Sequence, residues 1–153
     1  MSTLHNFMDI AILESQRSID PTRGVGALLF KNTNDNIVSK GYNTFPFWLD
    51  LSKLNTMQKE EKAVLATHAE IECLENTHNS LDLNDPSEYT MIITCAPCIN
   101  CAMAIVNSKL NITRVVYRQQ SLSYAFKLRF SIKESKQYLL DNNIKVEELC
   151  HTH

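Results

Sequence analysis

Two short segments, His68-Ala69-Glu70 and Pro97-Cys98-Ile99-Asn100-Cys101, constrain this chain more than any other feature of its sequence. One histidine and a C-x₂-C pair can supply nitrogen and sulfur ligands to a single zinc ion. Three protein ligands leave the fourth tetrahedral position open for water, which is typical of a catalytic zinc site rather than a structural one. We therefore expect one zinc ion per chain, with Glu70 beside it as a proton carrier and not as a fourth ligand.

The cysteine content supports a metal site. Five cysteines form an odd set, and three of them lie between Cys95 and Cys101. In a reducing compartment such clustering indicates metal binding or catalysis rather than disulfides. A thioredoxin-type redox pair is the alternative interpretation of C-x₂-C, but that motif does not come with H-A-E. Cys95 extends the run toward an iron–sulfur pattern, which lacks its fourth cysteine and proline here; we expect Cys95 to be a small buried residue near the site.

The positions of these residues on helices matter for their chemistry. Pro97 suits the first residue of a helix, where its missing N–H costs nothing, and Cys98 and Cys101 would then share one face of the first turn. Residues two apart, such as His68 and Glu70, do not face each other along a helix and can share a site only where a helix begins. The alternative is a capping box in which Glu70 bonds back to Thr67, but this explains neither the histidine nor the cysteine segment.

Hydrophobic periodicity predicts one α/β domain over residues 1–153. We expect helices over Leu4–Ile12, from Glu61 or Thr67 to Asn76, and over Pro97–Lys109 and Lys133–Asn142. Strands are expected over Val25–Phe30, Ile37–Tyr42, Tyr89–Thr94, Ile112–Tyr117 and Ile144–Glu147. The first two strands should form a hairpin, and the later ones, which alternate with helices, should be parallel, with helices on both faces of the sheet. Residues 44–60 should be a long loop with one helical turn around Leu51–Leu54, and Thr77–Glu88 a surface connection.

Charge and hydropathy exclude several classes of protein. The net charge of -2 argues against nucleic acid as a partner, because nucleic-acid-binding proteins usually carry a basic stripe. It is compatible with a small anionic substrate held by one or two cations. No apolar run approaches the roughly 20 residues that span a membrane, and residues 1–6 lack the features of a signal peptide. We therefore expect a cytoplasmic protein with no membrane partner.

These motifs resemble those of the cytidine deaminase superfamily, and most closely those of its deoxycytidylate (dCMP) deaminase branch. The resemblance implies a three-layer α/β/α sandwich with a mixed five-stranded sheet, and a homo-oligomer. It is carried by Arg17-Ser18-Ile19-Asp20-Pro21, Val25-Gly26-Ala27, Gly41-Tyr42-Asn43-Thr44-Phe45-Pro46, the H-A-E segment, Thr94 to Ala102, and Arg114-Val115-Val116-Tyr117.

Applied to this sequence, the resemblance implies that His68, Cys98 and Cys101 bind zinc and that Glu70 is the proton shuttle. It also implies that Asn43 lies near the sugar hydroxyl. Backbone groups around Ala69 would contact the base. The implied reaction is the hydrolytic deamination of a free cytosine nucleotide, most of all dCMP to dUMP and ammonia.

The phosphate-binding residues are a separate question. Arg23, just before Val25-Gly26-Ala27, is the leading candidate, and a solvated surface arginine is the alternative. Lys53, Lys59 and Lys62 are weaker candidates. Aromatic residues of the long loop could stack on the base or simply anchor the loop; they are Phe45, Phe47 and Trp48.

Three departures from the dCMP deaminase pattern bear on the substrate. Glu72 stands where the family usually has asparagine, and Ala96 stands where serine is common. The segment Arg118–Tyr124 does not follow the pattern of tyrosine and acidic residues that is expected there. Three alternatives therefore stay open. One is deamination of a nucleoside, a free base or another amino-heterocycle. The second is editing of nucleic acid, as by transfer RNA adenosine deaminases, which usually have glutamate at the position of Ala96. The third is a scaffold that keeps zinc only for stability, against which the intact Glu70 argues.

Overall fold

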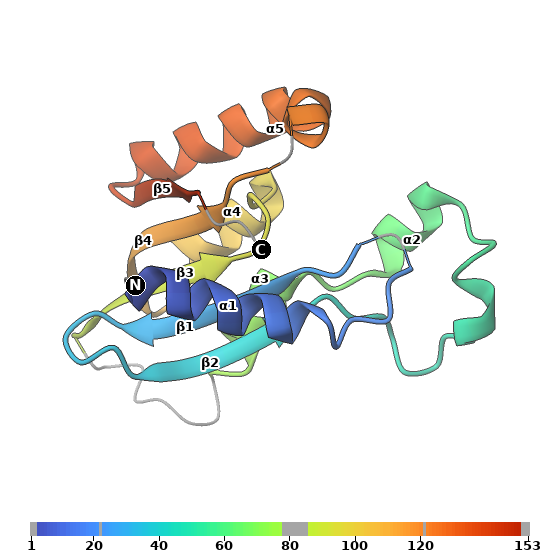
Figure 1. The fold of residues 1–153 in the computed structure, drawn as a ribbon, viewed down its shortest axis with the longest axis horizontal. Coiled ribbons are helices and arrows are strands. Elements are labelled where there is room, and N and C mark those ends of the chain that lie inside the picture. The colour runs from blue at the N-terminus through green and yellow to red at the C-terminus, as the bar shows by residue number, and fades with distance from the viewer. Residues whose placement is uncertain (1–2, 22, 78–85, 121, 151–153) are drawn as a thin grey trace.

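A computed structural model describes residues 3–21, 23–77, 86–120 and 122–150 of the chain (Figure 1). Five strands form one mixed sheet in the order β2-β1-β3-β4-β5. Strand β1 pairs antiparallel with β2 and with β3, whereas β3, β4 and β5 are parallel neighbours. The predicted hairpin and the predicted parallel strands are thereby confirmed. The strands are β1 (Gly26–Lys31), β2 (Ile37–Tyr42), β3 (Glu88–Ile93), β4 (Asn111–Arg118) and β5 (Lys145–Leu149).

Helices cover both faces of this sheet, so the predicted three-layer sandwich is confirmed. They are α1 (Thr3–Ser15), α2 (Lys59–Leu65), α3 (Ala69–Glu75), α4 (Ile99–Val106) and α5 (Leu122–Asp141), with a short 3₁₀ helix at Leu51–Lys53. Helix α1 covers one face, and α3, α4 and α5 cover the other (Figure 1). Among the described residues, no helix combines the length and the apolarity needed to cross a membrane.

The core is divided between the two faces because side chains alternate along each strand. Leu28 and Phe30 of β1 face α1, where they pack with Phe7, Met8 and Ala11. Ala27 and Leu29 point the other way, into a larger cluster with side chains of α3 and α4. Strands that are buried on both faces have near-continuous apolar sequences, which explains why β1 and β3 could be located from the sequence.

Two glycines allow the helices to approach the sheet closely. A Cβ added to Gly26 would lie 2.0 Å from the carbonyl oxygen of Ala11 in α1. One added to Gly41 would lie 2.5 Å from the backbone nitrogen of Cys73 and 2.7 Å from the carbonyl oxygen of Ala69, both in α3. The backbones of α1 and α3 therefore touch the sheet at positions where a larger residue would displace them.

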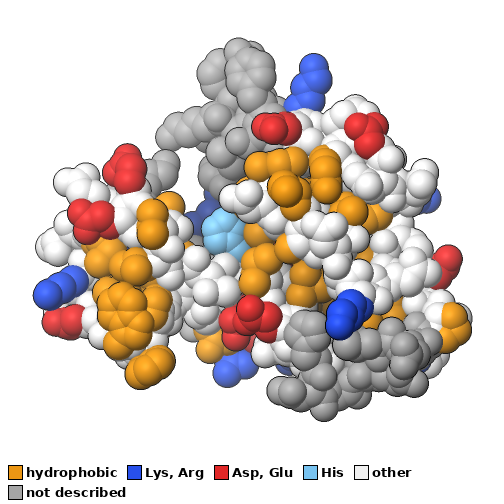
Figure 2. All heavy atoms as spheres, turned by 180° about the vertical axis from the view of Figure 1, so that it is seen from behind, with side chains coloured by type: hydrophobic (Ala, Val, Ile, Leu, Met, Phe, Trp, Pro, Cys, Tyr) orange, Lys and Arg blue, Asp and Glu red, His pale blue; other side chains and the backbone are white. Residues whose placement is uncertain are grey.

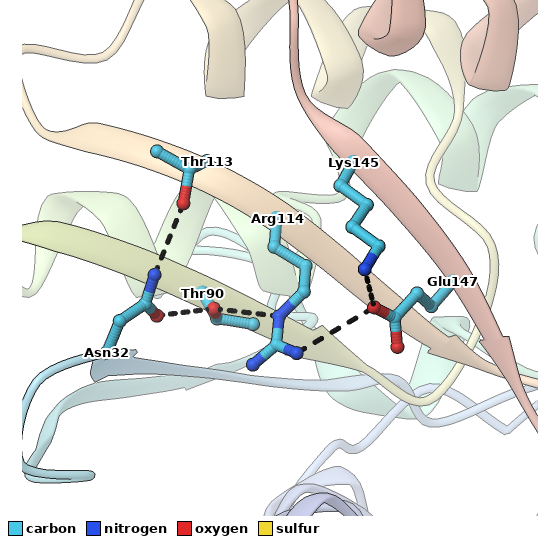
Figure 3. A network of polar contacts seen from close by, with 6 residues as sticks. All are labelled: Asn32, Thr90, Thr113, Arg114, Lys145 and Glu147. Atoms are coloured by element: carbon cyan, nitrogen blue, oxygen red, sulfur yellow. Dashed lines mark hydrogen bonds and ion pairs between the residues drawn. The ribbon is translucent and has the colours of Figure 1, made fainter.

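A polar network joins the strands at the end of the sheet where β3 and β4 begin (Figure 3). Thr90 donates to Asn32 Oδ1 at 2.6 Å and accepts from Arg114 Nε at 3.2 Å. Arg114 also forms an ion pair with Glu147 of β5, at 3.7 Å. The contacts run from the end of β1 across β3 and β4 to β5, so they hold these strands together by side chains as well as by the backbone.

Several predicted helix boundaries are wrong. Of the two predicted starts for the helix that ends at Asn76, Thr67 lies within two residues of the start of α3. The start at Glu61 is wrong, because Ala66 and His68 are both extended, with ψ of 139° and 154°, and separate α2 from α3. Helix α2 accordingly starts inside the predicted loop 44–60, although the predicted turn near Leu51 is present as the 3₁₀ helix. Helix α5 begins at Leu122, well before the predicted Lys133. Most of the predicted connection from Thr77 to Glu88 lies outside the described residues.

Residues 45–66, which we call the arm, project from the body of the molecule (Figure 1). Paired backbone bonds between Thr44 and Thr67, of 2.9 and 2.8 Å, close its base. Hydrophobic side chains are exposed on the lobe that the arm forms (Figure 2), and they are Phe47, Trp48, Leu51 and Val64. Phe47 is 100% exposed and Trp48 is 65% exposed, so neither side chain is buried in a way that would anchor the arm.

Candidate active site

The candidate site lies at one edge of the sheet, where β3 and β4 end. Because β1 is antiparallel to β3, with Ala27 opposite Ile93, β1 begins at this edge, and β2 ends there, with Tyr42 opposite Gly26. In open α/β sheets, ligands bind beyond the carboxyl ends of the strands. The predicted residues Arg23, Asn43, Cys98 and Cys101 lie in the segments that adjoin β1, β2 and β3 at this edge.

His68 and Glu70 flank the start of helix α3. His68 is the N-cap residue, with extended backbone, and Glu70 lies in the first turn. Both residues thus lie where a helix begins, which is the one place on a helix where we expected such a pair to be able to share a site. The alternative capping box is wrong, because the cap is His68 rather than Thr67 and no side chain caps the helix. The bridge between Thr44 and Thr67 positions the residue that immediately precedes His68.

The cysteine segment has an equivalent arrangement at α4. Cys98 is the N-cap residue of this helix, again with extended backbone, and Cys101 is buried in its first turn. Our prediction that the helix begins at Pro97 is therefore wrong. Pro97 precedes the N-cap, and the extended conformation of Cys98 directs the chain from β3 into α4.

The three predicted ligands come together in space. His68 Nδ1 lies 3.6 Å from Cys98 Sγ and 3.3 Å from Cys101 Sγ. Zn–S bonds of about 2.3 Å and Zn–N bonds of about 2.0 Å in a tetrahedron place nitrogen and sulfur about 3.5 Å apart. The three ligand atoms lie within 4.8 Å of one another, and among the described residues no other such group occurs. The residues therefore fit one zinc ion, and Cys95, buried nearby, is outside the group.

The site favours a thiolate at Cys98. A hydrogen bond from Cys101 and, to a smaller extent, one from His68 lower the pKa of Cys98 to about 4. The same contact with Cys98, together with burial, raises the pKa of Cys101. The pKa of His68 is raised, chiefly by its hydrogen bond to Cys98. A metal ion needs the thiolate form of cysteine, and this geometry supplies it at Cys98.

Glu70 is buried beside these ligands, with only 4% of its surface exposed. Burial raises the pKa of its carboxyl group, although a backbone hydrogen bond and a contact with Cys101 act in the opposite direction. Desolvation disfavours the charged form of a carboxyl group, so that it can hold a proton closer to neutral pH. A group with these properties, next to a metal site, suits general acid–base chemistry.

Asn43 holds the loop that precedes β1. Its Oδ1 accepts from the backbone nitrogen of Val25 at 2.8 Å, and its Nδ2 donates to the carbonyl oxygen of Arg23 at 3.0 Å. The side chain is 7% exposed. Ala69, the first residue of α3, is fully buried. Asn43 is thus a structural residue of this edge, and its predicted contact with a sugar stays a prediction.

Arg23 contacts a residue that the sequence analysis did not select. Its Nη2 donates to Oε1 of Gln120 at 3.1 Å, and Gln120 is 9% exposed. The weaker phosphate candidates belong to the arm, with Lys53 in its 3₁₀ helix and Lys62 in α2. The available signal for Gln120 was its position as a polar residue two places after β4, a strand that ends at this edge.

Known proteins share these features. The family model of the cytidine and deoxycytidylate deaminase zinc-binding region matches residues 1–119. Mouse deoxycytidylate deaminase is 35% identical over 107 residues, which are 67% of this chain and 57% of the mouse protein. The tRNA-specific adenosine deaminase of Rickettsia bellii is 34% identical over 86 residues, or 56% of this chain and 50% of that protein. The chain spans about half the length of these curated relatives.

The fold also has close counterparts among solved structures. The dCMP deaminase of cyanophage S-TIM5 in its apo form superposes with a TM-score of 0.69 at 24% identity, covering 97% of this chain and 100% of the phage protein. Its complex with dCMP and dUMP gives a TM-score of 0.67 at 23% identity, covering 97% of this chain and 99% of that one. This likeness confirms the predicted cytidine deaminase-like sandwich.

Proposed function

Because the chain belongs to the cytidine and deoxycytidylate deaminase family, we propose that it deaminates a free cytosine nucleotide, with dCMP as its preferred substrate. Water and dCMP would give dUMP and ammonia. The observation that carries this proposal is the convergence of His68, Cys98 and Cys101 beside the buried carboxyl group of Glu70. A scaffold that kept zinc only for stability would have no use for a buried carboxyl group there.

The residues of the site have distinct roles in this proposal. His68, through Nδ1, and the thiolates of Cys98 and Cys101 would hold one zinc ion. When bound, zinc supplies a Lewis acid that lowers the pKa of water from about 15.7 toward 7. Glu70 takes a proton from the attacking water on its carboxylate and delivers it to N3 of the cytosine ring, which makes C4 electrophilic. After the water oxygen has added to C4, Glu70 takes the second proton from that oxygen and passes it to the amine. The C4–N bond then breaks, ammonia leaves, and the C4 carbonyl group of the uracil ring forms.

The substrate contacts are proposed from the same edge of the sheet. Asn43 would lie near the sugar and the backbone around Ala69 near the base. Arg23 would make a charge-assisted contact with the phosphate. Two findings support a nucleotide: the similarity to mouse deoxycytidylate deaminase, and the likeness to the cyanophage enzyme, whose structure holds dCMP and dUMP.

Deamination of adenosine in transfer RNA is the second candidate, because the Rickettsia bellii relative is named for it. The net charge of -2 weighs against it, since an RNA-binding surface is usually basic. Side-by-side assays of zinc-loaded protein with dCMP, deoxycytidine and a short adenosine-containing RNA distinguish these functions. We expect the highest kcat/KM with dCMP, measured as ammonia released and as product separated by chromatography. A preference for deoxycytidine would exclude a nucleotide as the preferred substrate. If only the RNA were turned over, the function would instead be deamination of adenosine in RNA.

We also propose that the protein is a cytoplasmic homo-oligomer. The described residues contain no disulfide, which suits a reducing compartment. Large exposed hydrophobic side chains on the arm, such as Phe47 and Val64, are typical of surfaces that contact other proteins. Light scattering coupled to gel filtration tests the assembly, and a mass equal to the 17.5 kDa of one chain would contradict it.

A further inference from the structure

Gln120 connects three segments at the edge of the sheet that carries the site. It follows β4, and its buried side chain donates through Nε2 to the carbonyl oxygens of Arg118 and, at 3.5 Å, of Thr94. Its Oε1 accepts from Arg23 Nη2 at 3.1 Å. A guanidinium group only donates and a backbone carbonyl only accepts. The amide of Gln120 consequently has one orientation that satisfies its partners, with its oxygen toward Arg23.

Thr94 gives Gln120 a fixed support. Its Oγ1 accepts from the backbone nitrogen of Gly26 at 3.1 Å, and its own backbone nitrogen donates to the carbonyl oxygen of Gly26 at 3.0 Å. Thr94 also begins the segment that leads to Cys98. A displacement of Gln120 would therefore be resisted by contacts that belong to the sheet and to the metal-binding segment.

Arg23 is held from two sides. Its backbone oxygen accepts from Asn43 Nδ2 at 3.0 Å, and its guanidinium group reaches Gln120. Asn43 is followed by Thr44, whose bridge to Thr67 leads directly to His68. An arginine side chain loses rotamer entropy when it is fixed in one conformation. If the free protein has already fixed it, binding of a ligand does not have to meet that cost.

We infer that Gln120 is a positioning residue, which orients the guanidinium group of Arg23 toward the phosphate of the substrate and so sets the preference for a nucleotide over a nucleoside. This inference rests on the proposed function. Gln120 touches neither base nor metal ligand in it, and it acts through Arg23 alone.

The decisive variant is Gln120→Ala. We expect its kcat/KM ratio for dCMP over deoxycytidine to fall about tenfold, through KM for dCMP, with kcat retained. The dissociation constant of dUMP, measured by calorimetry, should rise by about the same factor, without any turnover. Zinc content should match that of the wild type. Gln119→Ala is the matched control, because Gln119 is the adjacent residue of the same type and is exposed; it should leave the ratio unchanged.

Coupling to Arg23 separates positioning from general damage. The double variant Arg23→Ala with Gln120→Ala should behave like Arg23→Ala alone, because residues that act through one contact are not additive. Arg23→Lys keeps the charge but removes the Nη2 donor, so its nucleotide preference should fall as it does in Gln120→Ala. This variant decides the question even if Gln120→Ala does not fold.

Three outcomes overturn the inference: equal losses for dCMP and deoxycytidine in Gln120→Ala, additive losses in the double variant, or a wild-type ratio in Arg23→Lys. A wild-type protein that prefers deoxycytidine would instead overturn the proposed function. A wild-type preference for dCMP that survives Gln120→Ala would overturn the positioning role alone.

Discussion

Cys95, Cys98 and Cys101 are close in sequence but differ in their surroundings. Cys98 and Cys101 lie within 3.6 Å of His68 Nδ1, whereas Cys95 is buried outside this group. We therefore expect Cys98→Ala to lose most of its zinc, because two ligands cannot complete a site of this type. Cys95→Ala should retain one zinc per chain. Elemental analysis of the two purified variants is the measurement, and undiminished zinc in Cys98→Ala would rule out the proposed ligand set.

Glu70 is the residue for which activity and stability should separate most clearly. In Glu70→Gln we expect kcat to fall by about 10²–10⁴ or more, because the amide cannot carry a proton. The folded protein raises the pKa of this carboxyl group, chiefly through burial. Because the pKa is higher in the folded state than in the unfolded state, ionisation of Glu70 lowers the free energy of unfolding as the pH rises. The neutral amide of Glu70→Gln avoids this loss, so at pH 7 the variant should have a Tm at least equal to that of the wild type. Steady-state kinetics and calorimetry on one sample test both, and an active variant would contradict the proton-carrier role.

At the scale of elements, the contact between β2 and α3 connects the sheet to the metal site. Gly41→Ala would place a Cβ 2.5 Å from the backbone of Cys73 and 2.7 Å from that of Ala69, and Ala69 follows His68 directly. Overpacking of this kind typically costs about 1–3 kcal/mol. We expect Gly41→Ala to lower both the free energy of unfolding and the affinity for zinc.

Ser39→Ala is the control on the same strand. It removes a hydrogen bond of 2.7 Å to the carbonyl oxygen of Cys73, worth about 0.5–1.5 kcal/mol, without displacing α3. Its zinc affinity should therefore stay at the wild-type value. Urea unfolding and competition with a chelator give the two quantities, and equal zinc affinities for both variants would show that α3 is not displaced.

The elements that were predicted correctly have strong local signals. The apolar runs of β1 and β3 are buried on both faces, and the hydrophobic residues of α1 have helical spacing. The predicted start of α4 is two residues too early, because proline is as compatible with the extended segment before an N-cap residue as with the first turn of a helix. The sequence left the helix start open between Glu61 and Thr67 because the bridge from Thr44 to Thr67, which keeps the chain extended between α2 and α3, is a tertiary contact.

At the scale of the whole molecule, the metal site joins two helices of one layer. His68 is the N-cap residue of α3 and Cys98 that of α4, so an ion bound to both would link the two helices and stabilise the folded state. With zinc at 100 times its dissociation constant, this amounts to about 2.7 kcal/mol, or a Tm change of about 5–10 °C for a domain of this size. We expect chelation to lower the Tm of the wild type by this amount and to leave that of Cys98→Ala unchanged. If chelation lowered the Tm of the wild type and of Cys98→Ala by the same amount, the stabilising metal would bind at another site.

The sequence predicted the site better than it predicted the surroundings of the site. His68 and the two cysteines could be selected because zinc chemistry restricts ligand type and spacing, and the structure brings these three residues together. The role of Glu70 stays a prediction. The contact between Arg23 and Gln120 joins residues 97 positions apart. No local pattern encodes such a pair, since it depends on β1 beginning and β4 ending at the same edge of the sheet.

The arm also determines how this protein can be observed. Trp48 is the only tryptophan in the chain, and it lies 65% exposed on the arm rather than in the sandwich. Intrinsic tryptophan fluorescence will therefore report on the arm alone. Thermal melts followed by this signal would record the arm losing its structure and not the core, which should be followed by circular dichroism. The same property makes Trp48 a label-free probe, because an emission shift on addition of dUMP or on assembly must originate where the arm is touched.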